Sequence, residues 1–288
     1  MSQRFGTNSI CYLVFLLGGC AGGGTTVETA APPFYTLPSS LRGQTFNVTS
    51  ATYTADFTGT IDSSLKDLSP NSTAQVSSSG DGIRIDVSET MDNGSAVYYH
   101  STFSFLNHPE LDSVGEINNF SYMAYGYWTN DIHCGSPISC LFSPEGGYFA
   151  FGVLTPGPAI PTTGQATYSG NFFGSFFTNT TGTNVAGNLT ASADFAQRTV
   201  GLSTTNVSPS GYGFSGTLSY AAGINALSGP LSTTASDANG PLATGTANAH
   251  FYGPNAEEIG GAFRMQRAVA SPSGTQNNTY VGSFGAKR

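Results

Sequence analysis

The sequence predicts an all-β protein, in which a β-rich N-terminal domain precedes an eight-stranded antiparallel up-and-down β-barrel. Only 9% of the 288 residues are charged, whereas 37 are Gly and 15 are Pro, which is a composition of strands and turns. Apolar and polar residues alternate in many short runs, as in strands with one buried face. Hydrophobic residues make up 39% of the chain and aromatic residues 12%, enough to build a core. These features exclude a helical bundle and a doubly wound α/β enzyme.

Residues 1–19 are predicted to be a lipoprotein signal peptide. A single charge, Arg4, precedes an apolar run over residues 10–17, which is shorter than the ~20 residues of a membrane-spanning helix. Residues 17–20 read Leu-Gly-Gly-Cys, similar to a bacterial lipobox, in which the chain is cut before a Cys that then carries acyl chains such as palmitate. An ordinary signal peptide with a chance Cys is the alternative.

Cys20 is therefore the expected lipidation site, and residues 20–45 are the expected flexible tether. A lipid anchor of this kind needs no transmembrane helix. Ala21, rather than Asp, follows the Cys, which by resemblance to bacterial sorting favours the outer membrane of a Gram-negative bacterium.

Cys134 and Cys140 are predicted to form a short-loop disulfide. Cys11 would be lost with the signal peptide and Cys20 acylated, which leaves this pair in an exported chain. A zinc site is the alternative, because His133 adjoins Cys134, but three crowded ligands fall short of the four that structural zinc takes. We expect no metal, and we expect the loop to be a recognition element, because a loop ordered in advance loses less entropy on binding.

The N-terminal domain is expected to cover residues 46–156. The turn Asp-Asn-Gly at residues 92–94 favours a hairpin, and the Pro-rich residues 155–164 cannot pair in a sheet and mark the boundary to the next domain. The alternating runs of this domain lie at residues 46–48, 53–57, 83–87, 97–105, 120–128 and 148–154.

The barrel domain is expected to cover residues 157–288. About eight alternating runs separated by clusters of Gly, Asn, Pro and Ser favour an up-and-down barrel, whose closure removes exposed strand edges. Repeated glycines within these runs are typical of a small, tightly curved barrel. The runs lie at residues 165–170, 171–177, 189–195, 198–204, 214–220, 244–252, 259–265 and 280–284.

Five segments together resemble transferrin-binding protein B-like surface lipoproteins. Residues 164–170, 249–263 and 281–287 are similar to the C-terminal barrel of that family, and residues 122–128 and 149–156 to the stretch before the barrel in its short, one-lobe, solute-binding-like members. The resemblance implies a β-rich handle domain next to an eight-stranded barrel. It also implies a non-enzymatic binding protein at the cell surface, whose ligand is a host iron protein or haem.

The charges and motifs agree with a protein that is neither an enzyme nor a nucleic-acid binder. The chain has nine Lys and Arg and 17 Asp and Glu, a formal net charge of −8. Proteins that bind the phosphates of nucleic acids instead carry a positively charged surface. Residues 211–216 match the dinucleotide glycine pattern, but they lead into a strand instead of a helix. Glu257 and Glu258 are adjacent in a strand and so diverge. We expect one to be solvated and the other hydrogen-bonded at the barrel end, and we expect no catalytic residue.

Aromatic residues around the Cys loop are the candidate ligand contacts. An imidazole held on a clamped loop among aromatic rings is one way to bind a haem iron. The alternatives are that these rings are core and that the histidine is solvated, and His100 and His250 are expected to be structural. The candidates are Tyr127, Trp128, His133, Phe142 and Tyr148.

The function expected from the sequence is capture of a host protein, haem or another solute by a lipid-anchored, non-catalytic protein of the outer membrane. Haem would be a ligand, and no cofactor is expected. The alternative is an adhesin or a structural surface lipoprotein without a small-molecule ligand.

Overall fold

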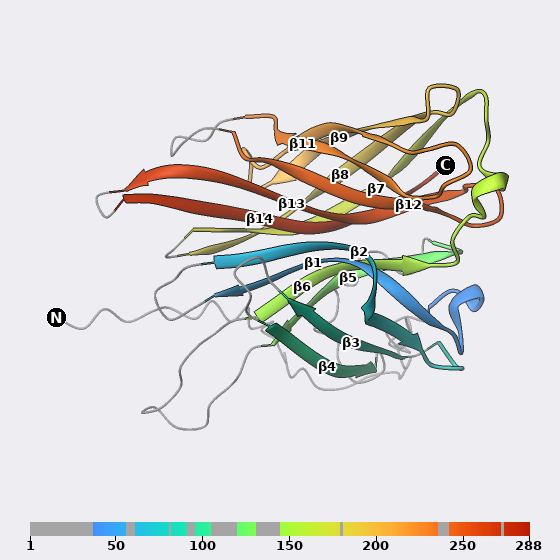
Figure 1. The fold of residues 1–288 in the computed structure, drawn as a ribbon, viewed down its shortest axis with the longest axis horizontal. Coiled ribbons are helices and arrows are strands. Elements are labelled where there is room, and N and C mark those ends of the chain that lie inside the picture. Colours follow the sequence, from blue (N-terminus) through green and yellow to red (C-terminus); the bar gives the residue numbers. More distant parts are fainter. Residues whose placement is uncertain are drawn as a thin grey trace, which may run out of the picture. The chain divides into compact units, whose positions relative to one another are not determined.

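A computed structural model describes residues 37–55, 61–80, 82–90, 96–104, 120–130, 145–178, 181–235, 242–271 and 274–288. The predicted all-β class is confirmed, because the described elements are strands and two short 3-10 helices (Figure 1). No helix among these residues is long and apolar enough to cross a membrane. Cys20, His133, Cys134, Cys140 and Phe142 lie outside the described residues, so the lipidation and disulfide stay predictions.

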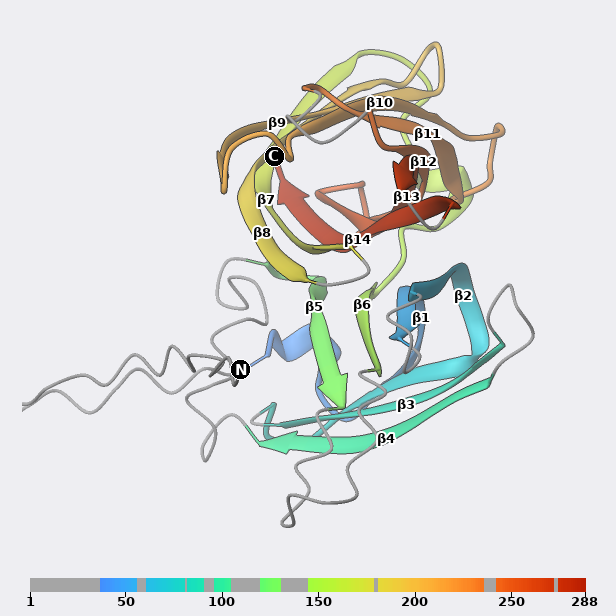
Figure 2. The same ribbon diagram turned by 90° about the vertical axis from the view of Figure 1, so that its left-hand side faces the viewer.

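Six antiparallel strands form the first sheet, which we call the handle sheet. Their order is β4-β3-β2-β1-β6-β5, so β1 lies inside the sheet between β2 and β6. Figure 2 shows that this sheet is curled, and it shows the barrel viewed roughly along the barrel axis. The strands are β1 (Thr45–Ala55), β2 (Ile61–Val76), β3 (Gly82–Thr90), β4 (Ala96–Ser104), β5 (Met123–Asn130) and β6 (Glu145–Gly152).

The core of the handle sheet extends into the stretch predicted as tether. The 3-10 helix η1 (Ser39–Leu41) precedes β1, and Leu37 and Leu41 are buried beside Val48 and Phe151. The ordered structure therefore begins before residue 45. The separation of the chain into a handle domain and a barrel domain at residue 156 stays a prediction, since residue contacts group Phe34–Arg288 as one compact unit.

Strand β2 is absent from the sequence prediction because its buried face is largely polar. Ser63 and Ser64 are buried, and the Ser64 hydroxyl hydrogen-bonds with that of Thr52 on β1 at 2.8 Å. The register of β1 and β2 also shifts around Leu68, whose φ is +41°. A strand that buries hydroxyls and carries a bulge does not show the apolar alternation on which the prediction relied.

Eight further strands close into an antiparallel up-and-down barrel, as predicted. Each strand pairs with its neighbours in the chain, and β14 pairs with β7 to complete the circle. The 3-10 helix η4 (Gly157–Ala159) leads into the first strand. The strands are β7 (Gln165–Phe177), β8 (Gly182–Asp194), β9 (Thr199–Ser208), β10 (Phe214–Ser219), β11 (Leu227–Thr233), β12 (Thr244–Tyr252), β13 (Glu258–Ser271) and β14 (Gly274–Lys287).

The predicted strand count is confirmed, although two of the assignments were wrong. The runs 165–170 and 171–177 form one strand, β7, in which Gly170 permits the close approach of the Gly285 carbonyl on β14. Strand β11 was missed because Gly229 and Pro230 are turn signals. Leu231 and Ser228 pair with β10 in the same register, but Gly229 and Pro230 between them do not pair with it. This gap is expected because proline has no N–H to donate.

Aromatic rings fill the middle of the barrel. Phe214 lies 4.7 Å from Phe263 and 4.9 Å from Phe172 between ring centroids, and Phe263 lies 5.1 Å from Tyr280. All four side chains are fully buried. Small barrels are commonly filled in this way, so binding surfaces are to be sought at the barrel ends and on the outer wall.

Candidate functional site

Three of the five candidate ligand residues are described, and they do not form one open site. Trp128 is 2% exposed and packs in the core of the handle sheet with Phe149 and Phe151. Tyr127 and Tyr148 pair across β5 and β6, with ring centroids 5.8 Å apart. Because neighbouring strand residues point to opposite faces, Trp128 and Tyr127 serve different clusters. The ligand-binding roles of all five residues stay predictions.

Tyr148 joins the handle sheet to the barrel. Its hydroxyl lies 2.6 Å from the Ser175 hydroxyl on β7, and Ser175 in turn donates to Asn184 Oδ1 at 2.8 Å. Since the Ser175 proton is used toward Asn184, Tyr148 is the donor to Ser175. Burial raises the pKa of Tyr148 well above its ordinary value, despite the hydrogen bond to Ser175. The hydroxyl therefore keeps its proton at neutral pH.

Glu258 forms a second link between the two parts. Its carboxylate oxygens accept the backbone N–H groups of Ser121 at 2.5 Å and Tyr122 at 2.9 Å. Burial raises the pKa of Glu258, and these N–H donors oppose that rise. Glu257 instead accepts from Asn255 at the exposed end of the barrel. Glu258 is thus the hydrogen-bonded glutamate that was predicted, and Glu257 is the more exposed one, although it is hydrogen-bonded as well. The prediction that both lie in one strand was wrong, because β13 begins at Glu258.

His250 has the structural role that the sequence predicted. It is 1% exposed, its Nδ1 contacts the carbonyl oxygen of Asn225, and its Nε2 lies 2.6 Å from Asp67 Oδ1 on β2. Thr49 donates to the same Asp67 oxygen at 3.0 Å. Both ring nitrogens face acceptors, so this histidine ties β12 to the bulged part of β2.

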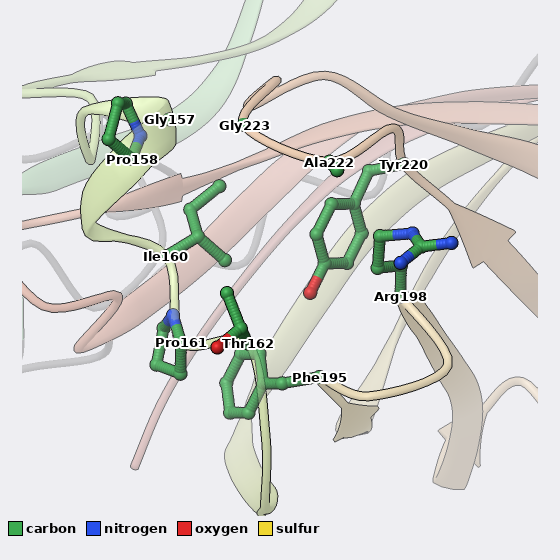
Figure 3. A pocket seen from close by; sticks show the side chains of 10 residues that line it. All are labelled: Gly157, Pro158, Ile160, Pro161, Thr162, Phe195, Arg198, Tyr220, Ala222 and Gly223. Carbon is green, nitrogen blue, oxygen red and sulfur yellow. The ribbon is translucent and has the colours of Figure 1, made fainter.

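A hollow of about 210 Å³ opens at one end of the barrel, and we call it the barrel-end hollow (Figure 3). Three segments meet there: the Pro-rich stretch around η4, the turn between β8 and β9, and the loop between β10 and β11. Most of its wall is apolar. The lining residues are Gly157, Pro158, Ile160, Pro161, Thr162, Phe195, Arg198, Tyr220, Ala222 and Gly223.

Three side chains in this wall can donate hydrogen bonds: those of Thr162, Tyr220 and Arg198. Tyr220 is 8% exposed, and its buried hydroxyl has no hydrogen-bond partner in the described part of the chain. Burial raises the pKa of this hydroxyl, and the positive charge of Arg198 opposes the rise, as expected from their proximity. Figure 3 shows the Arg198 side chain beside the Tyr220 ring and the hydroxyl directed into the space between Ile160 and Phe195.

Sequence reasoning missed this hollow because it treated residues 155–164 only as a domain boundary. Arg198 did carry a signal, since it ends the tight turn after β8. It has a φ of +55°, a left-handed conformation in which Gly or Asn is easier to place. No group of three or more His, Cys, Asp or Glu suited to a metal ion occurs in the described ranges.

Comparison with known proteins connects the barrel to one family. Residues 160–288 match the family described as C-lobe and N-lobe beta barrels of Tf-binding protein B. Over 198 residues the chain is 28% identical to transferrin-binding protein B of Haemophilus influenzae, covering 59% of this chain and 31% of that protein. The chain thus spans about a third of the length of this curated relative.

Solved structures of the same kind are similar to the chain. Isotype 1 transferrin-binding protein B from serogroup B Neisseria meningitidis is 19% identical with a TM-score of 0.48, covering 83% of this chain and 43% of that one. A surface lipoprotein is 16% identical with a TM-score of 0.44, covering 83% and 98%. The resemblance found in the sequence is confirmed by the family match: residues 160–288 match the family of transferrin-binding protein B lobe barrels, and the chain is similar to transferrin-binding protein B.

Proposed function

We propose that this chain is a non-catalytic binding protein, lipid-anchored in the outer membrane of a Gram-negative bacterium and exposed at the cell surface. It captures a host iron-carrying protein, for which transferrin is the first candidate. The observation that carries this proposal is the family match of the barrel, together with the relative whose name states that it binds transferrin. Haem or another solute is the alternative ligand.

The packing of the barrel supports binding through its surface. Its interior is occupied by aromatic rings, and the barrel-end hollow of about 210 Å³ is smaller than the roughly 300–1,000 Å³ of sites for drug-sized ligands. A macromolecular partner would therefore contact loops and the outer faces of strands. A haem would need a place other than this hollow, such as the predicted loop around His133.

A binding experiment on the full chain tests the proposal. Cells that display the chain are incubated with iron-loaded transferrin, iron-free transferrin and serum albumin, and retained protein is measured. We expect saturable retention of transferrin and none of albumin. Retention of neither transferrin form contradicts the transferrin assignment, and an absorbance titration with haemin then tests the alternative. Adhesion of the cells to host surfaces without any bound iron protein or haem would favour an adhesin instead.

The anchor is tested separately. Replacing Cys20 with Ser and labelling with a palmitate analogue should abolish the label on the chain, with Cys11→Ser as the matched control that keeps it. An unchanged label on Cys20→Ser contradicts the lipidation.

A further inference from the structure

The size of the barrel-end hollow limits what it can hold. An apolar cavity of about 150 Å³ accommodates benzene, with its six carbon atoms. By proportion, a hollow of about 210 Å³ suits a group of roughly eight non-hydrogen atoms. Pro158, Ile160 and Phe195 present apolar surface to such a group. The body of a matching ligand is therefore small and apolar.

The hydroxyl of Tyr220 indicates a polar group on that ligand. Nearly all buried polar groups in folded proteins have a hydrogen-bond partner, so a buried hydroxyl without one calls for an explanation. The Tyr220 oxygen is buried and unpartnered in the described part of the chain, and it is directed into the hollow (Figure 3). A hydroxyl that retains its proton here can donate to an acceptor on a bound molecule.

Two opposite charges act on this hydroxyl: the positive charge of Arg198 lowers its pKa, and the negative charge of Asp194, which has the smaller effect, raises it. Arg198 is exposed at the rim, and the ion pairs among the described residues do not include it. The nearby carboxylate of Asp194 accepts the backbone N–H of Gln197 at 3.0 Å and Gln165 Nε2 at 3.3 Å, so its oxygens are directed toward these groups. A guanidinium fork beside an unpaired hydroxyl matches the two oxygens of a carboxylate.

We propose that the barrel-end hollow binds a small apolar carboxylate of about eight non-hydrogen atoms. The apolar part fills the space between Ile160 and Phe195. The carboxylate accepts from the Tyr220 hydroxyl, and the exposed Arg198 side chain changes rotamer to donate to it. Neither contact involves the handle sheet, so this site does not depend on the proposed capture of an iron-carrying protein.

The probe is 4-methylpentanoate, which has eight non-hydrogen atoms, compared with its amide of the same shape. Binding to the full chain is measured by titration calorimetry and by saturation-transfer NMR at neutral pH. We expect saturable binding of the acid and at least tenfold weaker binding of the amide, because hydrogen bonds to charged groups discriminate by about ten- to hundredfold.

Three variants locate the site. Arg198→Gln and Tyr220→Phe should each weaken binding of 4-methylpentanoate about tenfold or more. The matched control is Arg84→Gln, which removes another exposed arginine, on β3 of the handle sheet. It should leave the affinity unchanged. Arg198→Gln keeps a non-glycine residue at the same exposed position, so it tests the charge without altering the core.

Four results would overturn the proposal: no saturable binding of the acid, equal affinity for acid and amide, unchanged affinity in Arg198→Gln, or unchanged affinity in Tyr220→Phe. Transferrin retention by the same variants separates the two proposals. Variants that lose the carboxylate but retain transferrin show that the hollow is an independent site.

Discussion

Replacing Gly285 with Ala should weaken the packing of the handle sheet on the barrel. Gly285 lies in β14, and a Cβ atom at this position would be 2.5 Å from Cδ1 and 2.7 Å from Cε1 of Tyr125 on β5, and 3.0 Å from Cζ of Phe120. Carbon atoms in good contact are about 3.5–4.0 Å apart, so the Tyr125 ring would have to move by roughly 1 Å.

The surroundings of the ring oppose that movement. Tyr125 is fully buried, edge-on to Phe120 at 5.8 Å and stacked with Phe173 at 6.0 Å between centroids. Strand β14 is paired on both sides, to β13 and to β7, so its backbone cannot retreat easily. Overpacking a filled core of this kind costs about 1–3 kcal/mol. For a chain of this size, that cost lowers the melting temperature by about 2–12 °C.

The matched control is Gly201→Ala in β9. A Cβ atom there meets only the Ser192 carbonyl oxygen, at 3.9 Å. This change should leave the free energy of unfolding the same or raise it by up to about 1 kcal/mol.

Urea unfolding followed by fluorescence and by circular dichroism measures both variants. Trp128 is the single tryptophan and lies in the core of the handle sheet, so its fluorescence reports on that sheet. We expect Gly285→Ala to unfold at lower urea than the parent in both signals. If Gly285→Ala unfolds at the same urea concentration as Gly201→Ala, the described contact between β5 and β14 is wrong.

Three further predictions concern the handle sheet and its links to the barrel. Trp128→Ala should lower the free energy of unfolding by about 3–5 kcal/mol in urea titrations, whereas an affinity change without a stability change would mark Trp128 as a ligand contact. Tyr148→Phe removes the donor to Ser175 and should lower the free energy of unfolding by about 1–2 kcal/mol in thermal unfolding. The control is Tyr127→Phe, at a half-buried residue, which should lower it by less than about 0.5 kcal/mol. Because burial raises the pKa of Glu258, its protonated form stabilises the fold below the ordinary glutamate pKa, and this stabilisation is lost as pH rises through the raised pKa. Between about pH 4 and pH 7, the free energy of unfolding of the parent should therefore fall relative to that of Glu258→Gln. A difference between the two free energies that stays constant with pH would contradict this.

Local signals in the sequence determined the fold class and most strands. The alternation of apolar and polar residues is a property of each strand alone, and Gly and Pro mark turns through their own backbone preferences. The eight-stranded barrel could be predicted for this reason.

Tertiary structure decided which residues pair across long distances. Strand β2 buries serines because Thr52 and Arg264 supply their hydrogen bonds, and Arg264 Nε reaches Ser63 Oγ from 201 residues away. Strand β11 tolerates Pro230 because β12 pairs with it on the other side. The local sequence pattern indicates neither the hydrogen bonds of the β2 serines nor the pairing of β11 with β12.

The candidate sites depended most on the tertiary structure. The sequence grouped aromatic residues near the Cys loop as ligand contacts, but their burial is set by distant strands. Residues of β1 to β3 help to bury Trp128, and Ser175 on β7 hydrogen-bonds with the buried Tyr148. The barrel-end hollow brings Ile160, Arg198 and Tyr220 together only when the barrel closes. Composition and alternation thus determined that this chain is a β-barrel protein, whereas burial and side-chain partnership required the folded chain, because they arise between residues that the sequence keeps far apart.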